Sequence, residues 1–90
     1  MDIIYDPTKD RSNLEKHGVP LSAASLLEWD TAIEKPDDRE DYGEQRYRAF
    51  GFIGNRLYCV VYVDRNEVRR IISLRKANAR EVNEYVKANQ

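Results

Sequence analysis

Residues 69–77 read RRIISLRKA, a short apolar run flanked by cations, and this stretch decides how the second half of the chain folds. Side chains alternate between the two faces of a strand. One face is therefore expected to carry Arg70, Ile72, Leu74 and Lys76. The other face is expected to carry Arg69, Ile71, Ser73 and Arg75. One of these sets must supply the core, so its cations lie at the rim of the core.

Two more strands are predicted before this one. Residues 46–53 alternate between two sets of side chains, and Gly54-Asn55 suits the hairpin turn that follows. Residues 57–63 are continuously apolar, which is typical of a central strand covered on both faces. Residues 64–67 supply the next turn, so the three strands form an antiparallel meander.

The chain is expected to begin with a short strand at residues 3–5 and a helix. Asp6 suits the N-cap of this helix, and Pro7 suits its first position because no amide hydrogen is needed there. The helix ends at Gly18, which suits the left-handed conformation that follows many helices.

Residues 20–28 read as a second, short helix, whose buried residues would be Leu21, Ala24 and either Leu26 or Leu27. Residues 29–33 are interpreted as a short strand. Residues 34–45 are dense in charge and contain proline and glycine, so they are interpreted as a mobile loop, in which Tyr42 is the one apolar anchor.

A helix is predicted to close the chain. It starts at Asn78, and Glu81 three positions later completes a capping box. Val82, Tyr85 and Val86 give this helix an apolar side that docks on the sheet. The element order predicts an α+β fold: a small twisted antiparallel sheet with two N-terminal helices and one C-terminal helix, forming one domain over residues 1–90.

Composition favours a cytoplasmic protein with a cationic working surface. No apolar run approaches the roughly 20 residues of a membrane span, and the start lacks a signal-peptide pattern. The single cysteine, Cys59, lies in an apolar run and is expected to be a buried thiol. Residues 1–45 hold 5 Lys and Arg against 12 Asp and Glu, whereas residues 46–90 hold 10 against 4. This asymmetry favours a cationic face on the second half; a solvated surface with segregated charge is the alternative.

Arginine suits an RNA phosphate because its planar fork donates two hydrogen bonds and stays charged. RNA cleavage without a metal needs a base for the 2′-hydroxyl, cations for the charge at phosphorus and an acid for the leaving oxygen. The acid and base candidates are His17, Glu81 and Tyr85. The candidate RNA-binding cations are Lys16, Arg46, Arg69 and Lys76, and Arg70 and Arg75 are the candidate catalytic cations.

Most of these candidates also have a structural explanation. His17 stands where a cation stabilises a helix C-terminus, Glu81 belongs to the capping box, and Tyr85 is a packing aromatic. Arg46 has Glu44 as a possible ion-pair partner. No metal site is predicted, because the chain has one histidine, one cysteine and no carboxylate pattern tied to them. No phosphate-binding glycine loop is present, and no cofactor is expected.

Several segments together resemble the BrnT family of toxins from bacterial BrnT/BrnA type II toxin–antitoxin systems. The opening Tyr5-Asp6-Pro7 with Lys9 resembles the family's start. The remaining matches are N-x-x-KHGV at residues 13–19, E-x-R at Glu44 and Arg46, R-I-I-S-x-R-x-A at residues 70–77, and E-x-x-x-Y at Glu81 and Tyr85. The resemblance covers nearly the whole chain. It departs at Pro20 and Leu21, where relatives often have a serine cap and an aromatic, and at Leu74, where alanine is usual.

The resemblance implies a RelE-like fold, ribonuclease activity that arrests growth, and neutralisation by a BrnA-type antitoxin. That antitoxin would dimerise through a ribbon-helix-helix domain and carry the pair to operator DNA. The site residues carried over are Arg70, Arg75, Glu81 and Tyr85, with a second rank of Lys16, His17 and Arg46.

The residues and the resemblance together predict a metal-independent endoribonuclease. Arg70 and Arg75 would hold the phosphate, while Glu81 or His17 would act as the base. Tyr85 would orient the substrate or act as the acid. Two rivals stay open: a non-catalytic protein- or nucleic-acid-binding module acting as operon co-repressor, and a degenerate toxin kept as a repressor partner.

Overall fold

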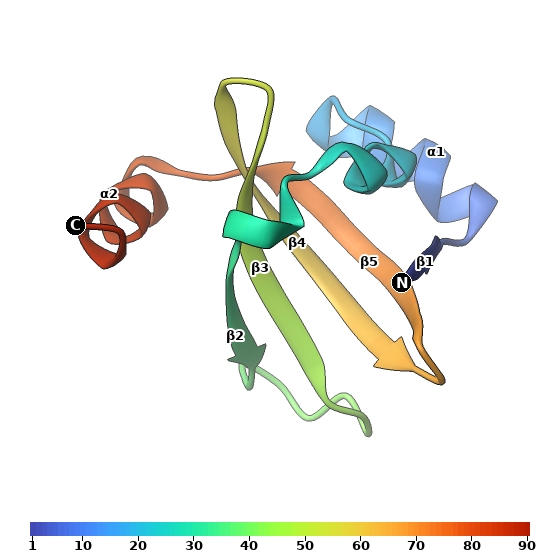
Figure 1. The fold of residues 1–90 in the computed structure, drawn as a ribbon. Coiled ribbons are helices and arrows are strands. Elements are labelled where there is room, and N and C mark those ends of the chain that lie inside the picture. The colour runs from blue at the N-terminus through green and yellow to red at the C-terminus, as the bar shows by residue number, and fades with distance from the viewer.

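A five-stranded sheet organises the protein in the computed structural model (Figure 1). Its strands are β1 (Asp2–Ile4), β2 (Ile33–Asp37), β3 (Arg46–Ile53), β4 (Arg56–Arg65) and β5 (Val68–Lys76). They lie in the order β1-β5-β4-β3-β2. All neighbours are antiparallel except β1 and β5, which run parallel. The α+β class is confirmed, but the sheet is mixed, because the first strand pairs with the last across a long connection.

Two α-helices and two short 3₁₀ segments surround the sheet. They are α1 (Pro7–His17), η1 (Leu21–Leu26), η2 (Trp29–Thr31) and α2 (Ala79–Ala88). At the start of α1, the Asp6 carboxylate accepts a hydrogen bond from the Thr8 amide at 2.8 Å, and Gly18 follows the helix at φ +75°. Both ends of α1 therefore confirm the prediction. None of the helices is long and apolar enough to cross a membrane.

The segment after α1 differs from the prediction in two ways. The second helix is a 3₁₀ helix, after which Leu27 is buried and Leu26 is exposed. The strand predicted at residues 29–33 is wrong: Trp29 begins η2, and its indole donates to the Ala24 carbonyl at 3.0 Å. The second strand, β2, instead takes the first part of the predicted loop. It tolerates Pro36 because it lies at the sheet edge.

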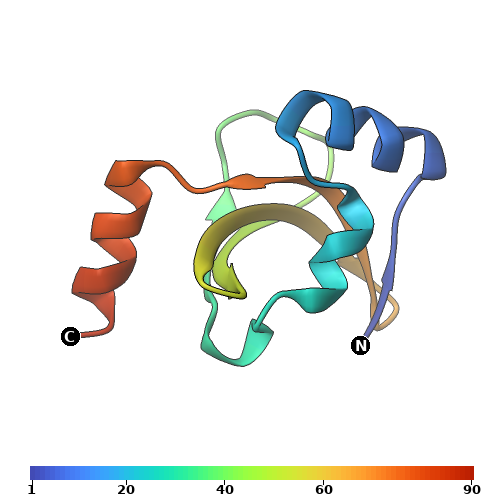
Figure 2. The ribbon, with the colours of Figure 1, turned by 90° about the horizontal axis from the view of Figure 1, so that it is seen from above.

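The sheet separates two apolar clusters. The larger joins η1 and the segment around it to one face of the strands, and its members include Leu21, Leu27, Val60, Ile71 and Leu74. The smaller lies on the opposite face and comprises Phe50, Leu57, Cys59 and Ala77, with Val82 and Tyr85 of α2 packed against it. Seen from above, α1 and α2 lie at opposite sides of the sheet (Figure 2). The predicted docking of α2 holds for two of its three apolar residues, because Val86 stays 50% exposed.

A β-bulge in β5 changes which side chains share a face. Val61 pairs with Ser73, but the next residue, Tyr62, pairs with Ile71, so Ile72 is an extra residue. Ile71 and Leu74 consequently point into the same cluster, although three residues separate them. The predicted alternation along residues 69–76 is therefore wrong beyond the bulge.

The side chain of Asn13 fixes α1 against β5. Its amide donates to the Val19 and Leu74 carbonyls at 2.7 Å each, and its carbonyl oxygen accepts from the Leu74 amide at 3.3 Å. Asn13 is buried, so these bonds satisfy backbone groups on the part of β5 that has no neighbouring strand. His17 lies one turn later and shares this side of α1.

Candidate functional site

Arginines gather on the face of the sheet that carries the smaller apolar cluster, which we call the arginine face. On β3, Arg46 and Arg48 alternate with residues of the larger cluster and share the side of Phe50. On β5, Arg75 pairs with Cys59 and Arg70 pairs with Val63, two residues of β4 that share a face. The bulge brings Arg70 and Arg75 to one side, whereas regular alternation predicted opposite sides.

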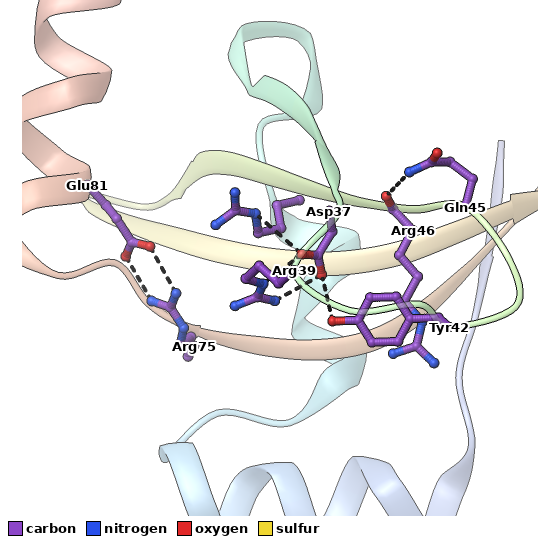
Figure 3. A network of polar contacts seen from close by, with 8 residues as sticks. Asp37, Arg39, Tyr42, Gln45, Arg46, Arg75 and Glu81 are labelled. Atoms are coloured by element: carbon purple, nitrogen blue, oxygen red, sulfur yellow. Dashed lines mark hydrogen bonds and ion pairs between the residues drawn. The ribbon is translucent and has the colours of Figure 1, made fainter.

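Arg75 of β5 and Glu81 of α2 form a two-pronged ion pair at one end of this face (Figure 3). Nη1 and Nη2 of Arg75 donate to the two carboxylate oxygens at 2.8 and 2.9 Å. The same carboxylate accepts from the Asn78 amide at 2.9 Å, completing the predicted capping box. The hydrogen bonds from Arg75 lower the pKa of Glu81 to about 2. Glu81 is thus a buried anion that holds Arg75 in place.

Arg75 nevertheless keeps donors for a ligand. A guanidinium has five N–H groups. Two of them bind Glu81, and a third binds the Lys76 carbonyl at 3.2 Å. The side chain is 32% exposed, and its two remaining N–H groups have no partner within the chain.

A second carboxylate–arginine pair stands at the β2 edge, where the sequence analysis placed only a charged loop (Figure 3). The Asp37 side chain is 0% exposed and accepts from Nε and Nη2 of Arg39 at 2.6 and 2.9 Å. Tyr42 also donates to it at 3.4 Å. The Arg39 hydrogen bonds lower the pKa of Asp37. Nothing in the local sequence distinguishes Asp37 from the five other acids of residues 34–45, so this pair was missed.

The β3 arginines are less fully paired. Arg46 lies with its guanidinium 4.0 Å from the centre of the Tyr42 ring and has Glu44 at 3.9 Å. The nearest carboxylate oxygen to Arg48 is that of Asp37, also at 3.9 Å from Nε. The Nε atoms of both arginines are buried and lack a hydrogen-bond partner. Sequence analysis named Arg46 and missed Arg48, which shares the same face two residues later.

Arg70 lies on the arginine face without a partner in the chain. It is exposed, and its side chain takes part in no ion pair or hydrogen bond with the rest of the chain. It lines a hollow of about 390 Å³ together with Ile4, Val63 and Val68. An exposed guanidinium beside a hollow is free to meet a phosphate.

Arg69 lies on the opposite face and is fully engaged there. It donates to both oxygens of Asp64 at 2.8 and 2.9 Å, and its guanidinium stacks 4.5 Å from the Trp29 ring and 4.1 Å from the Tyr62 ring. Its side chain is only 15% exposed, and the Asp64 hydrogen bonds raise its pKa. The structure therefore separates Arg69 from the other predicted RNA-binding arginines.

The remaining candidates are spread around the arginine face. The Tyr85 hydroxyl donates to the Thr31 carbonyl at 2.9 Å, so it connects α2 to η2. His17 is half-buried and Lys16 exposed at the end of α1; the exposed Lys76 ends β5. The side chains of these three form no ion pair or hydrogen bond. The buried Cys59 pairs with Arg75 across the strands, and burial raises the pKa of its thiol.

The side chains of the arginine face are hydrogen-bond donors that suit an anion. No group of three or more His, Cys, Asp or Glu side chains is placed to hold a metal ion. A row of arginines, two of them oriented by carboxylates, matches the planar geometry and negative charge of phosphate groups. The fold and this face define a small α+β protein with an arginine-rich surface on one side of its sheet.

A family comparison identifies the kind of protein. Residues 5–81 match the family described as "Ribonuclease toxin, BrnT, of type II toxin-antitoxin system". Because this match spans most of the chain, the protein belongs to the BrnT family of ribonuclease toxins, and the predicted resemblance is confirmed. A toxin of this type implies an antitoxin partner. A search of curated proteins by sequence similarity finds no match to the chain.

Proposed function

We propose that this chain is a metal-independent endoribonuclease that binds RNA across the arginine face and cleaves it beside Arg75. The Arg75–Glu81 pair is the observation that carries the proposal. It holds a guanidinium in one orientation, with two N–H groups left for a ligand. Donors fixed before the substrate arrives need no reorganisation when charge develops at phosphorus.

The reaction needs no nucleophile from the protein. The 2′-hydroxyl of the RNA gives its proton to a base and attacks the adjacent phosphorus; the bond to the 5′-oxygen of the next nucleotide breaks, that oxygen takes up a proton from an acid or from water, and a 2′,3′-cyclic phosphate forms. Arg75 stabilises the added negative charge on the phosphate oxygens, a contribution typically worth about 10²–10³ in rate. Arg70 binds the RNA chain from the neighbouring part of the face.

We assign Glu81 to orienting Arg75 rather than to proton transfer. Its pKa of about 2 lies far below neutral pH, where an efficient general base needs a higher value. Both carboxylate oxygens are also engaged by Arg75. The base is then His17: α1 lies along the free edge of β5, where Asn13 bonds the backbone of Leu74 beside Arg75, and His17 follows Asn13 by one helical turn. Tyr85 holds α2 through its bond to η2.

The family membership supports finer proposals about fold and partner. We propose a RelE-like arrangement for the fold and a BrnA-type antitoxin, with a ribbon-helix-helix domain, as the partner. Cleavage of messenger RNA by the free toxin would inhibit translation and arrest growth. Expression of the chain in bacteria, with and without the protein encoded beside its gene, tests this: growth arrest relieved by the neighbour is the expected result.

Purified, antitoxin-free protein incubated with RNA in a chelator tests the nuclease itself. The expected result is cleavage with 2′,3′-cyclic phosphate and 5′-hydroxyl ends. Cleavage that occurs only after a divalent metal is added would overturn the mechanism. Tight RNA or partner binding without any cleavage, on free or ribosome-bound message, would favour the non-catalytic co-repressor instead.

A further inference from the structure

Asp37 is bound by Arg39 much as Glu81 is bound by Arg75, but a second arginine, Arg48, lies beside Asp37 without a hydrogen bond to it. Arg39 occupies both carboxylate oxygens of Asp37. Arg48 remains 3.9 Å from the nearer oxygen, beyond hydrogen-bond distance, although it faces the same carboxylate. One buried anion therefore lies beside two cations and is bound directly by only one of them.

The unpaired nitrogen of Arg48 needs an explanation. Its Nε is buried and has no hydrogen-bond partner, while the side chain as a whole is 26% exposed. Buried donors are nearly always paired in folded proteins, since an unmade bond is costly. A guanidinium that is held near a carboxylate, but not bound by it, is placed to receive a second anion from solvent.

The position of Arg48 relates it to the proposed cleavage site. On this face, Phe50 of β3 pairs with Cys59 of β4, and Cys59 pairs with Arg75 of β5. Arg48 lies two residues before Phe50, so two strand spacings of about 4.8 Å and one two-residue step of about 6.8 Å separate the Arg48 and Arg75 backbones. The two arginines are neighbours on one surface and are held by different carboxylates.

We propose that Arg48, together with Arg39, forms a second phosphate subsite for the RNA strand whose cleaved phosphate lies at Arg75. The inference rests on the proposed function and extends it: the preferred substrate is a single strand with at least two consecutive phosphates. Asp37 keeps Arg39 in place and prevents the two guanidinium groups from repelling each other when the site is empty.

Substrate length separates the two sites. Cleavage rates are compared for a dinucleoside monophosphate, which has one phosphate, and a trinucleoside diphosphate, which has two. Arg48→Ala is expected to lower kcat/KM for the longer substrate by about 10-fold to 100-fold, mainly through KM, and to leave the shorter one within about 2-fold. Arg75→Lys is expected to slow both. Equal effects of Arg48→Ala on both substrates, or none on either, would overturn the subsite.

Two additions keep the result interpretable. Arg56→Ala is the matched control, because Arg56 is an exposed arginine outside both pairs and forms no ion pair; both substrates should be unaffected. Arg48→Lys retains the charge without the planar fork and replaces Arg48→Ala if that variant fails to fold, as judged by circular dichroism. The same length-dependent loss, in smaller measure, is expected.

Binding distinguishes failure of the subsite from failure of the nuclease proposal. Non-cleavable 2′-O-methyl oligonucleotides with one or two phosphates are titrated at several salt concentrations. Loss of the Arg48 contact should reduce the dependence of log K on log salt by about 0.7 for the two-phosphate strand alone. If the salt dependence changes in this way but RNA is not cleaved, the subsite proposal stands and the nuclease proposal is rejected. If loss of the Arg48 contact has the same effect on strands with one and two phosphates, the subsite proposal is rejected and the nuclease proposal is unaffected.

Discussion

The two faces of the sheet use arginine in opposite ways. Arg69 and Arg75 lie six residues apart on β5, and the bulge at Ile72 sends them to opposite faces. On the face of the larger apolar cluster, Arg69 is 15% exposed, bound by Asp64 and covered by two aromatic rings. On the arginine face, Arg75 is held by one carboxylate and retains free donors. The neighbours of a cation, more than its position in a motif, decide whether it serves the fold or a ligand.

The largest expected effect comes from Arg75→Lys. Lysine keeps the positive charge but cannot bind Glu81 and a phosphate with one planar fork. We expect RNA cleavage to fall about 10²–10³-fold while antitoxin binding and the far-ultraviolet circular dichroism spectrum persist. Cleavage within 3-fold of wild type would show that the reaction does not depend on this guanidinium.

The Arg75–Glu81 pair also predicts a pH dependence of stability. The pKa of Glu81 is lowered from 4.5 to about 2, so the pair stabilises the fold above about pH 4.5, and about 3 kcal/mol is lost as pH falls through 2. Urea unfolding of wild type and Glu81→Gln at pH 7, 4 and 2 measures this. The free-energy difference between the two proteins should shrink by about that amount at pH 2. A constant difference would mean that the pair contributes little.

On the other face, Arg69→Ala should affect stability rather than activity. The change removes two charged hydrogen bonds and two cation–π contacts. We expect the free energy of unfolding to fall by about 2–3 kcal/mol, with cleavage per folded molecule unchanged. A variant that is stable but inactive would contradict the conclusion that Arg69 serves the fold and not the reaction.

Tyr85→Phe should give the smallest effect. It removes the hydroxyl that donates to the Thr31 carbonyl and leaves the ring packed edge-on against Phe52. We expect a loss of about 1 kcal/mol in stability and a change of less than about 3-fold in cleavage. If cleavage fell about 100-fold, Tyr85 would have to act as the acid, as the sequence analysis proposed.

Local signals explain why much of the fold was predictable. The cap residues Asp6, Gly18 and Asn78 fix helix ends by contacts within a few residues, and they were read correctly. The continuous apolar run of β4 likewise identified the central strand. Signals that depend on distant partners were not readable. The bulge has no local marker at Ile72, and β2 is hidden in a charged segment because only its pairing with β3 makes it a strand.

The residues of the candidate site divide in the same way, into those that local sequence signals predict and those that depend on distant partners. Arg75 and Glu81 were named from the sequence, and their close spacing across the β5–α2 turn brings them together. Arg39 and Arg48 were missed, because burial of the Asp37 carboxylate cannot be read from composition and Arg48 meets it from a neighbouring strand. Arg69 was grouped with the RNA-binding cations because the sequence gives no sign of its aromatic neighbours.

A matched charge reversal tests most directly whether RNA is cleaved on the arginine face. Arg70 and Arg56 are both exposed arginines without an ion pair, and only Arg70 lies on that face. The rate of RNA cleavage in chelator is measured for Arg70→Glu and Arg56→Glu. The account predicts a loss of at least about 10-fold for Arg70→Glu and less than about 2-fold for Arg56→Glu, with both variants folded. Equal losses, or a larger loss for Arg56→Glu, would contradict it.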